Sequence, residues 1–576
     1  MTFKPMTPLS SKPTDVRPVL QIGAIGHRSL AAVDIPELAA AANEVLRQIR
    51  DAARLATAAG AGVDLRCMSA LAEGADLLFA HAALELEYTL SVALPFHREI
   101  YRNDFSNDDA KSDYDSMLGR ATSVYELDGV SGDPFAYRAV GRVLVEQSDI
   151  LLAIWDGQPE RGPGGTADVI RNARNADVPV VTIAATAPYE VRIFASGGDK
   201  SAETIQDLIH HLLVHLPKES AIPLQLYLNE DLQKKSHAPD LLRHLENGLL
   251  LMGGKSATKP TETPSPVEGA STTLDPALLL QIDQTLGPHF AAADTLSIRY
   301  ATLYRTSALL RYLSVLPATI AAFFAFDGTP FESRLGFLAQ LLVLGGTLLI
   351  YYFDERGQWH RRFLDYRFIA EHLRQSRLMA LFGSTAALPR LPPHLAATAS
   401  DWVNWRLHAV VRSLGLVTAR VDAPFLAGAR EEARRELASQ IDYYERRASR
   451  YAALSRILHR IGVYFFGAGL TFTVVRECMA VLGYAGGAYV VSAELALFIP
   501  AFAPIFLGIR SQNEYERLSQ RYGSMAGEFR RIEQTLNDSA VSQNQTEDIA
   551  RNIVSVMQGE ISDWRVLIKA RSIDPY

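Results

Sequence analysis

Cysteine is scarce in this chain of 576 residues, which contains two, Cys67 and Cys478. They lie far apart, one in an apparent strand and one in an apolar segment, so a disulfide framework and a cysteine-based metal site are excluded. An excess of basic residues is also missing, because 57 Lys and Arg face 64 Asp and Glu, a net charge of -7. This balance argues against a general nucleic-acid binder, and we expect no nucleic-acid partner.

An apolar leader is absent as well. Residues 1–15 are rich in Pro, Ser, Thr and Lys and lack the apolar core of a signal peptide, so we expect the N-terminal region to stay in the cytoplasm. The chain is too long for one ordinary domain, and two or more are expected.

Strand and helix patterns alternate from Val19 to about residue 216. The apolar runs predict strands at Val19–Ile25, Val63–Met68, Thr89–Leu94, Ser123–Leu127, Ile150–Trp155 and Val178–Ala184. Segments with helical spacing separate them at Pro36–Ala59, Leu71–Leu86, Tyr137–Gln147, Ala167–Ala176 and Thr204–Leu216. This alternation predicts an α/β fold, a Rossmann-like, doubly wound parallel sheet covered on both faces. Ligands of such folds bind at the carboxyl ends of the strands.

Three of the predicted strands end in polar or glycine-rich sequences. These are Gly26-His27-Arg28, Ser69 followed by Glu73-Gly74, and Trp155-Asp156-Gly157. Turn chemistry explains any one of them. All three at one edge of a sheet favour a ligand site there.

A glycine-rich turn after the most apolar strand predicts phosphate binding. Gly164, Gly165 and Thr166 open a helix, where unpaired backbone N–H groups and the helix dipole favour an anion. Arg28 would supply a forked, charge-assisted contact to a phosphate. His27 would either donate a hydrogen bond to the ligand or cap the local backbone.

The remaining candidates suit the sugar and base of a nucleotide. Glu73 and Asp156 are acceptors for ribose hydroxyls, and Gly74 would let the ligand approach the second helix. Trp155 is either a stacking surface for a base or, as is more common for such a residue, part of the core. His211 and His215 have helical spacing but no third ligand nearby, so we expect no metal and no cofactor.

The second half of the chain contains four long apolar runs, Leu309–Phe326, Leu335–Phe353, Ile461–Val475 and about Ala488–Ile509. Each is near the length of a transmembrane helix, and the uncharged run Leu335–Phe353 disfavours the alternative of a soluble bundle. We therefore expect a ligand-binding domain over residues 16–250, a flexible linker over 253–274, and a membrane domain over 275–576 with four transmembrane helices.

The charges that flank the runs indicate orientation. Arginines crowd one side: Arg305, Arg311, Arg356, Arg361, Arg362, Arg446, Arg447, Arg450, Arg456, Arg460, Arg510 and Arg517. The short loops on the other side carry acids, so both termini are expected in the cytoplasm. Residues 299–305, RYATLYR, resemble residues 450–456, RYAALSR. We therefore expect two hairpin repeats, over about 275–385 and 430–545, and assembly of the chain into a homo-oligomer.

The segments IGHR (25–28), SALAEGAD (69–76), LPF (94–96) and DILLAIWDG…GPGGTADV (149–169) together resemble the SLOG superfamily. That superfamily includes DprA-like proteins, LOG-type nucleotide phosphoribohydrolases and the N-terminal domains of TRPM channels. The region from about residue 276 resembles SLATT membrane domains through its hairpins and flanking charges. The combination implies a bacterial inner-membrane effector of antiphage defence, gated by a nucleotide-derived second messenger, cyclic or ADP-ribose-like. Such an effector breaches the bilayer or opens an ion channel.

One departure from the LOG pattern bears on catalysis. LOG enzymes carry a catalytic Glu three residues after the motif threonine, where this chain has Val169. Asp168 is one residue away, turned by roughly 100° around a helix. We therefore expect binding without hydrolysis and assign no catalytic residue. The alternatives are a membrane-anchored nucleotide hydrolase with Glu73 or Asp156 as the base, and a constitutive ion channel.

Overall fold

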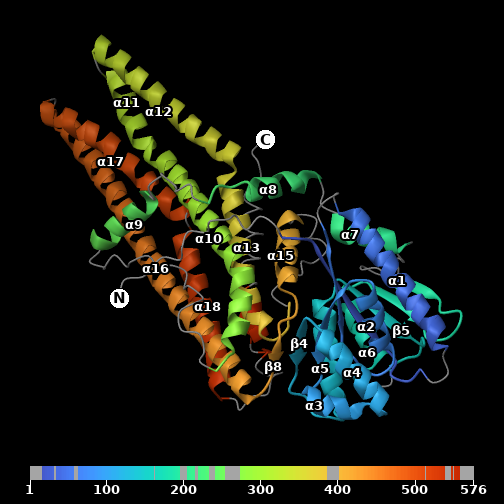
Figure 1. Ribbon diagram of the computed structural model, residues 1–576. Coiled ribbons are helices and arrows are strands. Elements are labelled where there is room, and N and C mark those ends of the chain that lie inside the picture. The colour runs from blue at the N-terminus through green and yellow to red at the C-terminus, as the bar shows by residue number, and fades with distance from the viewer. Residues whose placement is uncertain are drawn as a thin grey trace.

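The computed structural model joins an α/β sheet domain to long helices that point away from it (Figure 1). It describes residues 16–30, 34–57, 62–160, 162–194, 204–214, 218–232, 241–252, 273–327, 329–385, 401–484, 486–512, 514–538, 547–548 and 550–557. The predicted linker 253–274 lies outside the described residues up to residue 272.

The strands form one sheet in the order β7-β6-β5-β1-β2-β3-β4-β8. Their bounds are β1 Val19–Gly26, β2 Asp64–Ser69, β3 Thr89–Leu94, β4 Ser123–Glu126, β5 Ile150–Trp155, β6 Val180–Ala184, β7 Val191–Phe194 and β8 Ala419–Arg420. All neighbouring pairs are parallel except β6 and β7. The predicted mostly parallel α/β sheet is confirmed.

Helices cover both faces of the sheet. One face packs against α1 (Ile35–Ala56), α2 (Ala75–Glu85) and α7 (Ile205–Val214). The other packs against α5 (Pro134–Gln147) and α6 (Thr166–Asn175). The short helices α3 (Arg98–Tyr101), η1 (Arg102–Asp104) and α4 (Asp108–Arg120) lie between β3 and β4 in the chain, and α3 and α4 share a core cluster with α2.

The C-terminal half is helical. Its elements are α10 Pro276–Leu313, α11 Val315–Asp327, α12 Pro330–Gly357, α13 Trp359–Ala380, α15 Asp401–Leu414, α16 Ala423–Val481, α17 Gly487–Gln512 and α18 Tyr515–Asp538. Helix α11 packs on α12, α10 on α13, and α16 on both α17 and α18. Two connector helices, α8 (Lys218–Leu228) and α9 (Leu241–Met252), come between the sheet domain and these helices in the chain.

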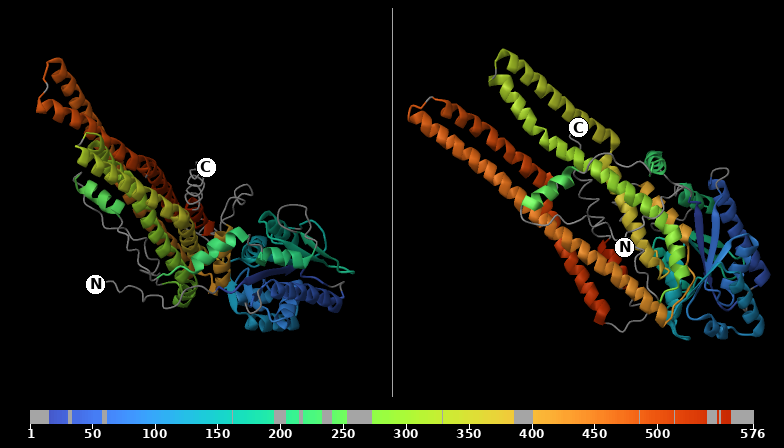
Figure 2. Two further views of the ribbon diagram at one scale, coloured as in Figure 1. Left: turned by 90° about the horizontal axis from the view of Figure 1, so that it is seen from above. Right: turned by 60° about the vertical axis from the view of Figure 1, so that its left-hand side comes forward.

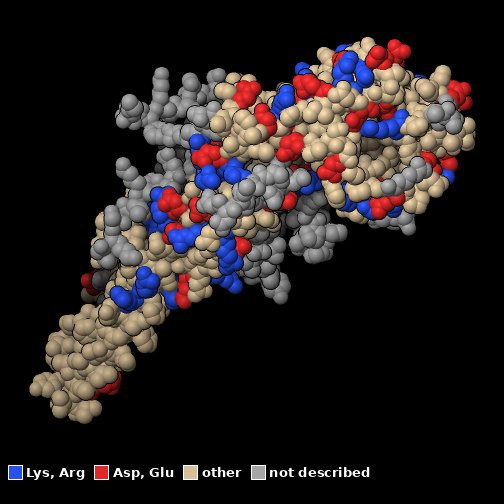
Figure 3. Space-filling model, turned by 90° about the horizontal axis from the view of Figure 1, so that it is seen from below, with Lys and Arg blue, Asp and Glu red and all other residues tan. Residues whose placement is uncertain are grey.

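Three helical stretches among the described residues are long and apolar enough to cross a membrane: Pro330–Ala380, Ala423–Val481 and Gly487–Leu536. Their ends form an arm whose surface is almost free of charged side chains (Figure 3). On α12, for example, Leu341 and Leu342 are 67% and 76% exposed. Contiguous apolar exposure of this kind marks a membrane or partner surface.

The expectation of four membrane helices differs from the structure at the first run. Leu309–Phe326 runs from the end of α10 into α11 and is not among these three stretches. The helix continues across their junction, because Ser314 N–H donates to Leu310 O at 2.9 Å and Ala318 N–H donates to Ser314 O at 3.2 Å. Helix α16 exceeds the length of a membrane span, because its 59 residues extend over roughly 88 Å. Its charged N-terminal part therefore projects well beyond a ~30 Å apolar layer.

The boundary between the two predicted domains is also less distinct than expected. Strand β8 comes from the C-terminal half yet pairs with β4, matching Tyr125 with Ala419 and Glu126 with Arg420. One hydrophobic cluster continues from α5 and α6 into α10, α13, α15 and α16. The sheet domain and the helical region therefore share a core, and both views in Figure 2 show them in contact.

Candidate functional site

The predicted strand ends lie at one edge of the sheet. Strand β1 pairs in parallel with both β2 and β5, matching Ala24 with Ser69 and Gly26 with Ile154. His27 Nε2 lies 3.2 Å from Asp156 Oδ1 and accepts the backbone N–H of Asp156 at 3.1 Å. The His27 ring thus joins the ends of β1 and β5 through these two contacts with Asp156.

Arg28 is the candidate cation that stays accessible, since its side chain is 45% exposed. Its guanidinium lies 5.0 Å from the centre of the Tyr137 ring and 5.9 Å from that of Tyr101. The nearest carboxylate oxygen, on Asp104, is 3.7 Å from Nη2. The two rings hold the guanidinium at the edge of the sheet, where it can bind an anion.

Tyr137 brings the glycine-rich turn to the same place. Gly164 has a φ of +77°, and a Cβ there would lie 2.7 Å from the Tyr137 Cβ and 2.6 Å from the Arg138 nitrogen. Arg28 and Gly164 thus both contact Tyr137, at the start of α5. The two parts of the predicted phosphate site lie on one side of the domain.

The turn itself differs from the expectation of free N–H donors. Gly164 N–H donates to Asp168 Oδ2 at 2.9 Å, and Gly165 N–H to Gly162 O at 3.4 Å. Asp168 is almost fully buried and also pairs with Arg138 at 3.2 Å and Arg171 at 2.5 Å. In this conformation the N–H groups of Gly164 and Gly165 thus have partners within the chain, and phosphate binding by Gly164, Gly165 and Thr166 stays a prediction. A side-chain carboxylate satisfies the first donor, which local sequence does not reveal.

Ser69, the last residue of β2, and the following Glu73 and Gly74 all contact other parts of the chain at this edge. Ser69 is fully buried, and its hydroxyl accepts the Leu71 N–H at 3.1 Å. Glu73 accepts both the hydroxyl and, at 3.0 Å, the N–H of Ser106. Gly74 has a φ of +92°, and a Cβ there would lie 2.4 Å from the carbonyl oxygen of Arg28. The close approach that requires a glycine at this position is therefore to the backbone of the chain itself.

The residues after β5 are tied to their own loop. Trp155 packs against the core cluster of α5 and α6, and its indole N–H donates to Gln158 O at 3.1 Å. Asp156 Oδ1 accepts the Gln158 N–H at 3.0 Å. Trp155 thus fits the core interpretation. Asp156 and Glu73, the two candidate bases for hydrolysis, both accept backbone N–H groups.

Asp76 was not among the predicted site residues, although it lies in the first turn of α2, close enough to Arg28 to feel its charge. Its side chain is buried, and Oδ2 accepts the Ala72 N–H at 3.4 Å. Burial raises the pKa of Asp76 to about 7, against the opposing effects of that N–H and of the Arg28 charge. The sequence signal that could have identified Asp76 is its position directly after Gly74-Ala75, at the start of a helix.

Within the described residues there is no group of three or more His, Cys, Asp or Glu side chains that could hold a metal ion. His215 lies outside the described residues. No protein-family model matches this chain, and no curated protein is similar to it.

Proposed function

We propose that this chain is a membrane effector gated by a nucleotide-derived signal, cyclic or ADP-ribose-like, which binds at the carboxyl edge of the sheet. The SLOG-like and SLATT-like sequences suggest this class. The half-exposed Arg28 supplies the contact to a phosphate, and the Gly164 turn lies against the same tyrosine, Tyr137. A phosphate that binds there either replaces Asp168 as the acceptor of the Gly164 N–H or binds next to Arg138 and Arg171.

Helix α5 is the observation that carries the proposal. Its first turns contain Tyr137 and Arg138, which contact Arg28 and Asp168 at the edge of the sheet. Its last turns contact the helical region instead. A rigid helix of 14 residues therefore joins the candidate site to the elements that lead toward the membrane arm.

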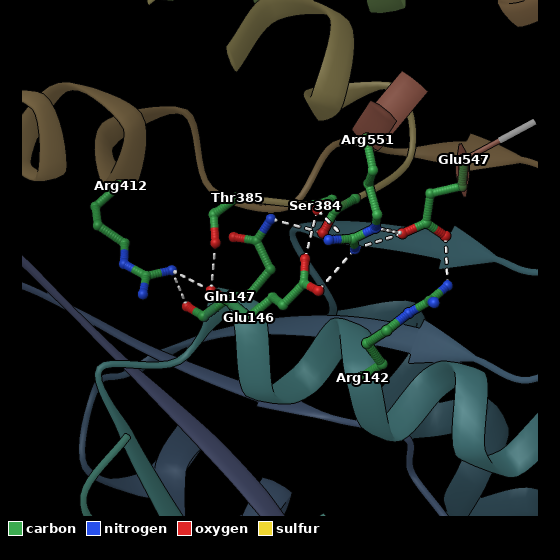
Figure 4. Close-up of polar contacts among 9 residues, drawn as sticks. Arg142, Glu146, Gln147, Ser384, Thr385, Arg412, Glu547 and Arg551 are labelled. Carbon is green, nitrogen blue, oxygen red and sulfur yellow. Dashed lines mark hydrogen bonds and ion pairs between the residues drawn. The ribbon is translucent and has the colours of Figure 1, made fainter. Parts of the chain in front are cut away.

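The contacts at the far end of α5 are polar and dense (Figure 4). Arg142 pairs with Glu547 at 2.5 Å, and Glu146 pairs with Arg551 at 2.7 Å. The Gln147 amide donates to Gly383 O at 2.9 Å, just after α13. Because buried charged networks have discrete arrangements, a shift of α5 is passed on to these partners.

The membrane part acts as two SLATT-like hairpins, α11–α12 and α16–α17, in a bacterial inner membrane with both termini in the cytoplasm. The protein works as a homo-oligomer in antiphage defence. Ligand binding changes the packing of the helices and opens a pore or breaches the bilayer. A ligand does this only if it binds the open arrangement more tightly than the closed one.

Dye-loaded vesicles containing the purified full chain test the proposal with a panel of cyclic nucleotides and ADP-ribose. A responding nucleotide should release dye, and R28A should weaken its binding roughly 10- to 100-fold, the effect of one charged hydrogen bond. R54A is the matched control, because Arg54 lies on α1 in an exposed pair with Glu87. E146Q should keep binding and lose dye release. Tight binding of a nucleotide without any release would contradict the proposal.

A further inference from the structure

The connector, residues 218–232 and 241–252, carries two carboxylates that reach into the helical region. They are Glu230, just after α8, and Glu246, on α9. Their side chains are 12% and 14% exposed. Carboxylates so far removed from water need charged or hydrogen-bonding partners, and each has both.

Glu230 joins α10 to α13. It lies 3.5 Å from Arg299 and 3.0 Å from Arg362, and it accepts the hydroxyl of Tyr300. Arg362 also donates to that hydroxyl at 2.7 Å. Two helices and the connector thus meet at one carboxylate.

Glu246 joins α16 to α18 in the same way. It lies 2.8 Å from Arg450 and accepts the hydroxyl of Tyr515 at 2.7 Å. Arg299 and Arg450 hold the same position in the two similar RYA sequences, and they precede the apolar runs at Leu309 and Ile461 by ten and eleven residues. Each helical pair therefore presents an equivalent arginine, at an equivalent depth, to a connector carboxylate.

Helix α9 adds an apolar contact between the two pairs. Its residues Leu242, Leu249 and Leu250 are buried in a cluster with Leu309 of α10 and with Leu454 of α16. Helix α9 contacts both α10 and α16. The connector therefore spans the bases of both pairs, close to where the apolar arm begins.

We propose that Glu230 and Glu246 form a two-point clasp that holds the bases of the two helical pairs together and keeps the membrane path closed. The clasp rests on the proposed function and gives it a regulatory element: movement of the sheet domain opens the path by pulling the connector away. A carboxylate–arginine pair that is mostly removed from water is strongly disrupted when one partner loses its charge. The glutamine substitutions E230Q and E246Q keep the size of the side chain while removing that charge.

The test uses the full chain, without nucleotide, in dye-loaded vesicles. The double variant E230Q/E246Q should release dye roughly tenfold faster than the wild type, within the range usual for coupled sites. Hydrogen exchange of residues 218–232 and 241–252 should also accelerate. E355Q is the control, because Glu355 is exposed near the end of α12, and it should change neither readout. The swap E246R/R450E should restore slow exchange relative to E246R alone.

Two results would overturn the clasp: unchanged exchange of the connector in the double variant, or faster exchange without faster release in a protein whose wild type responds to a nucleotide. Failure of the proposed function has a different signature. In that case no variant and no nucleotide in the panel would release dye, while the double variant would still show faster exchange and so support the clasp as a structural tie.

Discussion

The buried carboxyl of Asp76 predicts a stability that depends on pH. Burial raises the pKa of Asp76 from 3.8 to about 7. In the unfolded chain the proton is lost near pH 4, so between about pH 4 and pH 7 the folded state binds more protons. Stability therefore falls as the pH rises through this window. Each pKa unit corresponds to about 1.36 kcal/mol, so the full destabilisation above pH 7 is about 4 kcal/mol.

The variant D76N removes this dependence, because an amide of the same shape cannot ionise and can still accept the Ala72 N–H. Between pH 5 and pH 8 its stability relative to the wild type should grow by about 3 kcal/mol. For a unit of 150–250 residues that is roughly 6–12 °C in melting temperature.

Thermal unfolding of the detergent-solubilised full chain, followed by circular dichroism at several pH values, measures the difference. Comparing variant and wild type at each pH cancels the titration of all other groups. A difference in melting temperature that stays constant from pH 5 to pH 8 would refute the assignment of a raised pKa to Asp76.

Two further predictions concern backbone and interdomain contacts. G74A should destabilise the sheet domain by about 2 kcal/mol more than G132A. Both positions have a positive φ, but only a Cβ at Gly74 would meet neighbouring backbone, at 2.4 Å. Equal melting temperatures of the two variants would show that the loop moves aside to accept the added Cβ. R412A should destabilise by about 3–5 kcal/mol, since Arg412 is buried, pairs with Asp149 at 2.9 Å and donates to the last carbonyls of α5. R420A, which removes an exposed pair with Glu99, should cost at most about 1 kcal/mol. Urea denaturation that ranks these two arginine variants equally would contradict the buried role of Arg412.

Some features of the candidate site could be predicted from local sequence patterns, and others could not. The strand ends at Gly26 and Trp155 were predictable, since parallel strands place their carboxyl ends at one edge. The hydrogen bond from Gly164 to Asp168 was not, because the direction of a buried side chain depends on its neighbours, here Arg138 and Arg171. Glu73 was expected to accept a ribose hydroxyl, and in the structure it accepts the N–H of Ser106. The sequence could not predict this contact for the same reason.

By itself, the sequence determined the parallel sheet and the apolar arm, because short apolar runs, helical spacing of 3.6 residues and long uncharged runs are local properties of the chain. Only the tertiary structure decided that β8 completes the sheet from about 300 residues away, that Tyr137 joins Arg28 to the Gly164 turn, and that Glu230 and Glu246 meet matching arginines. These contacts link segments distant in sequence, and no local periodicity encodes which distant partners meet.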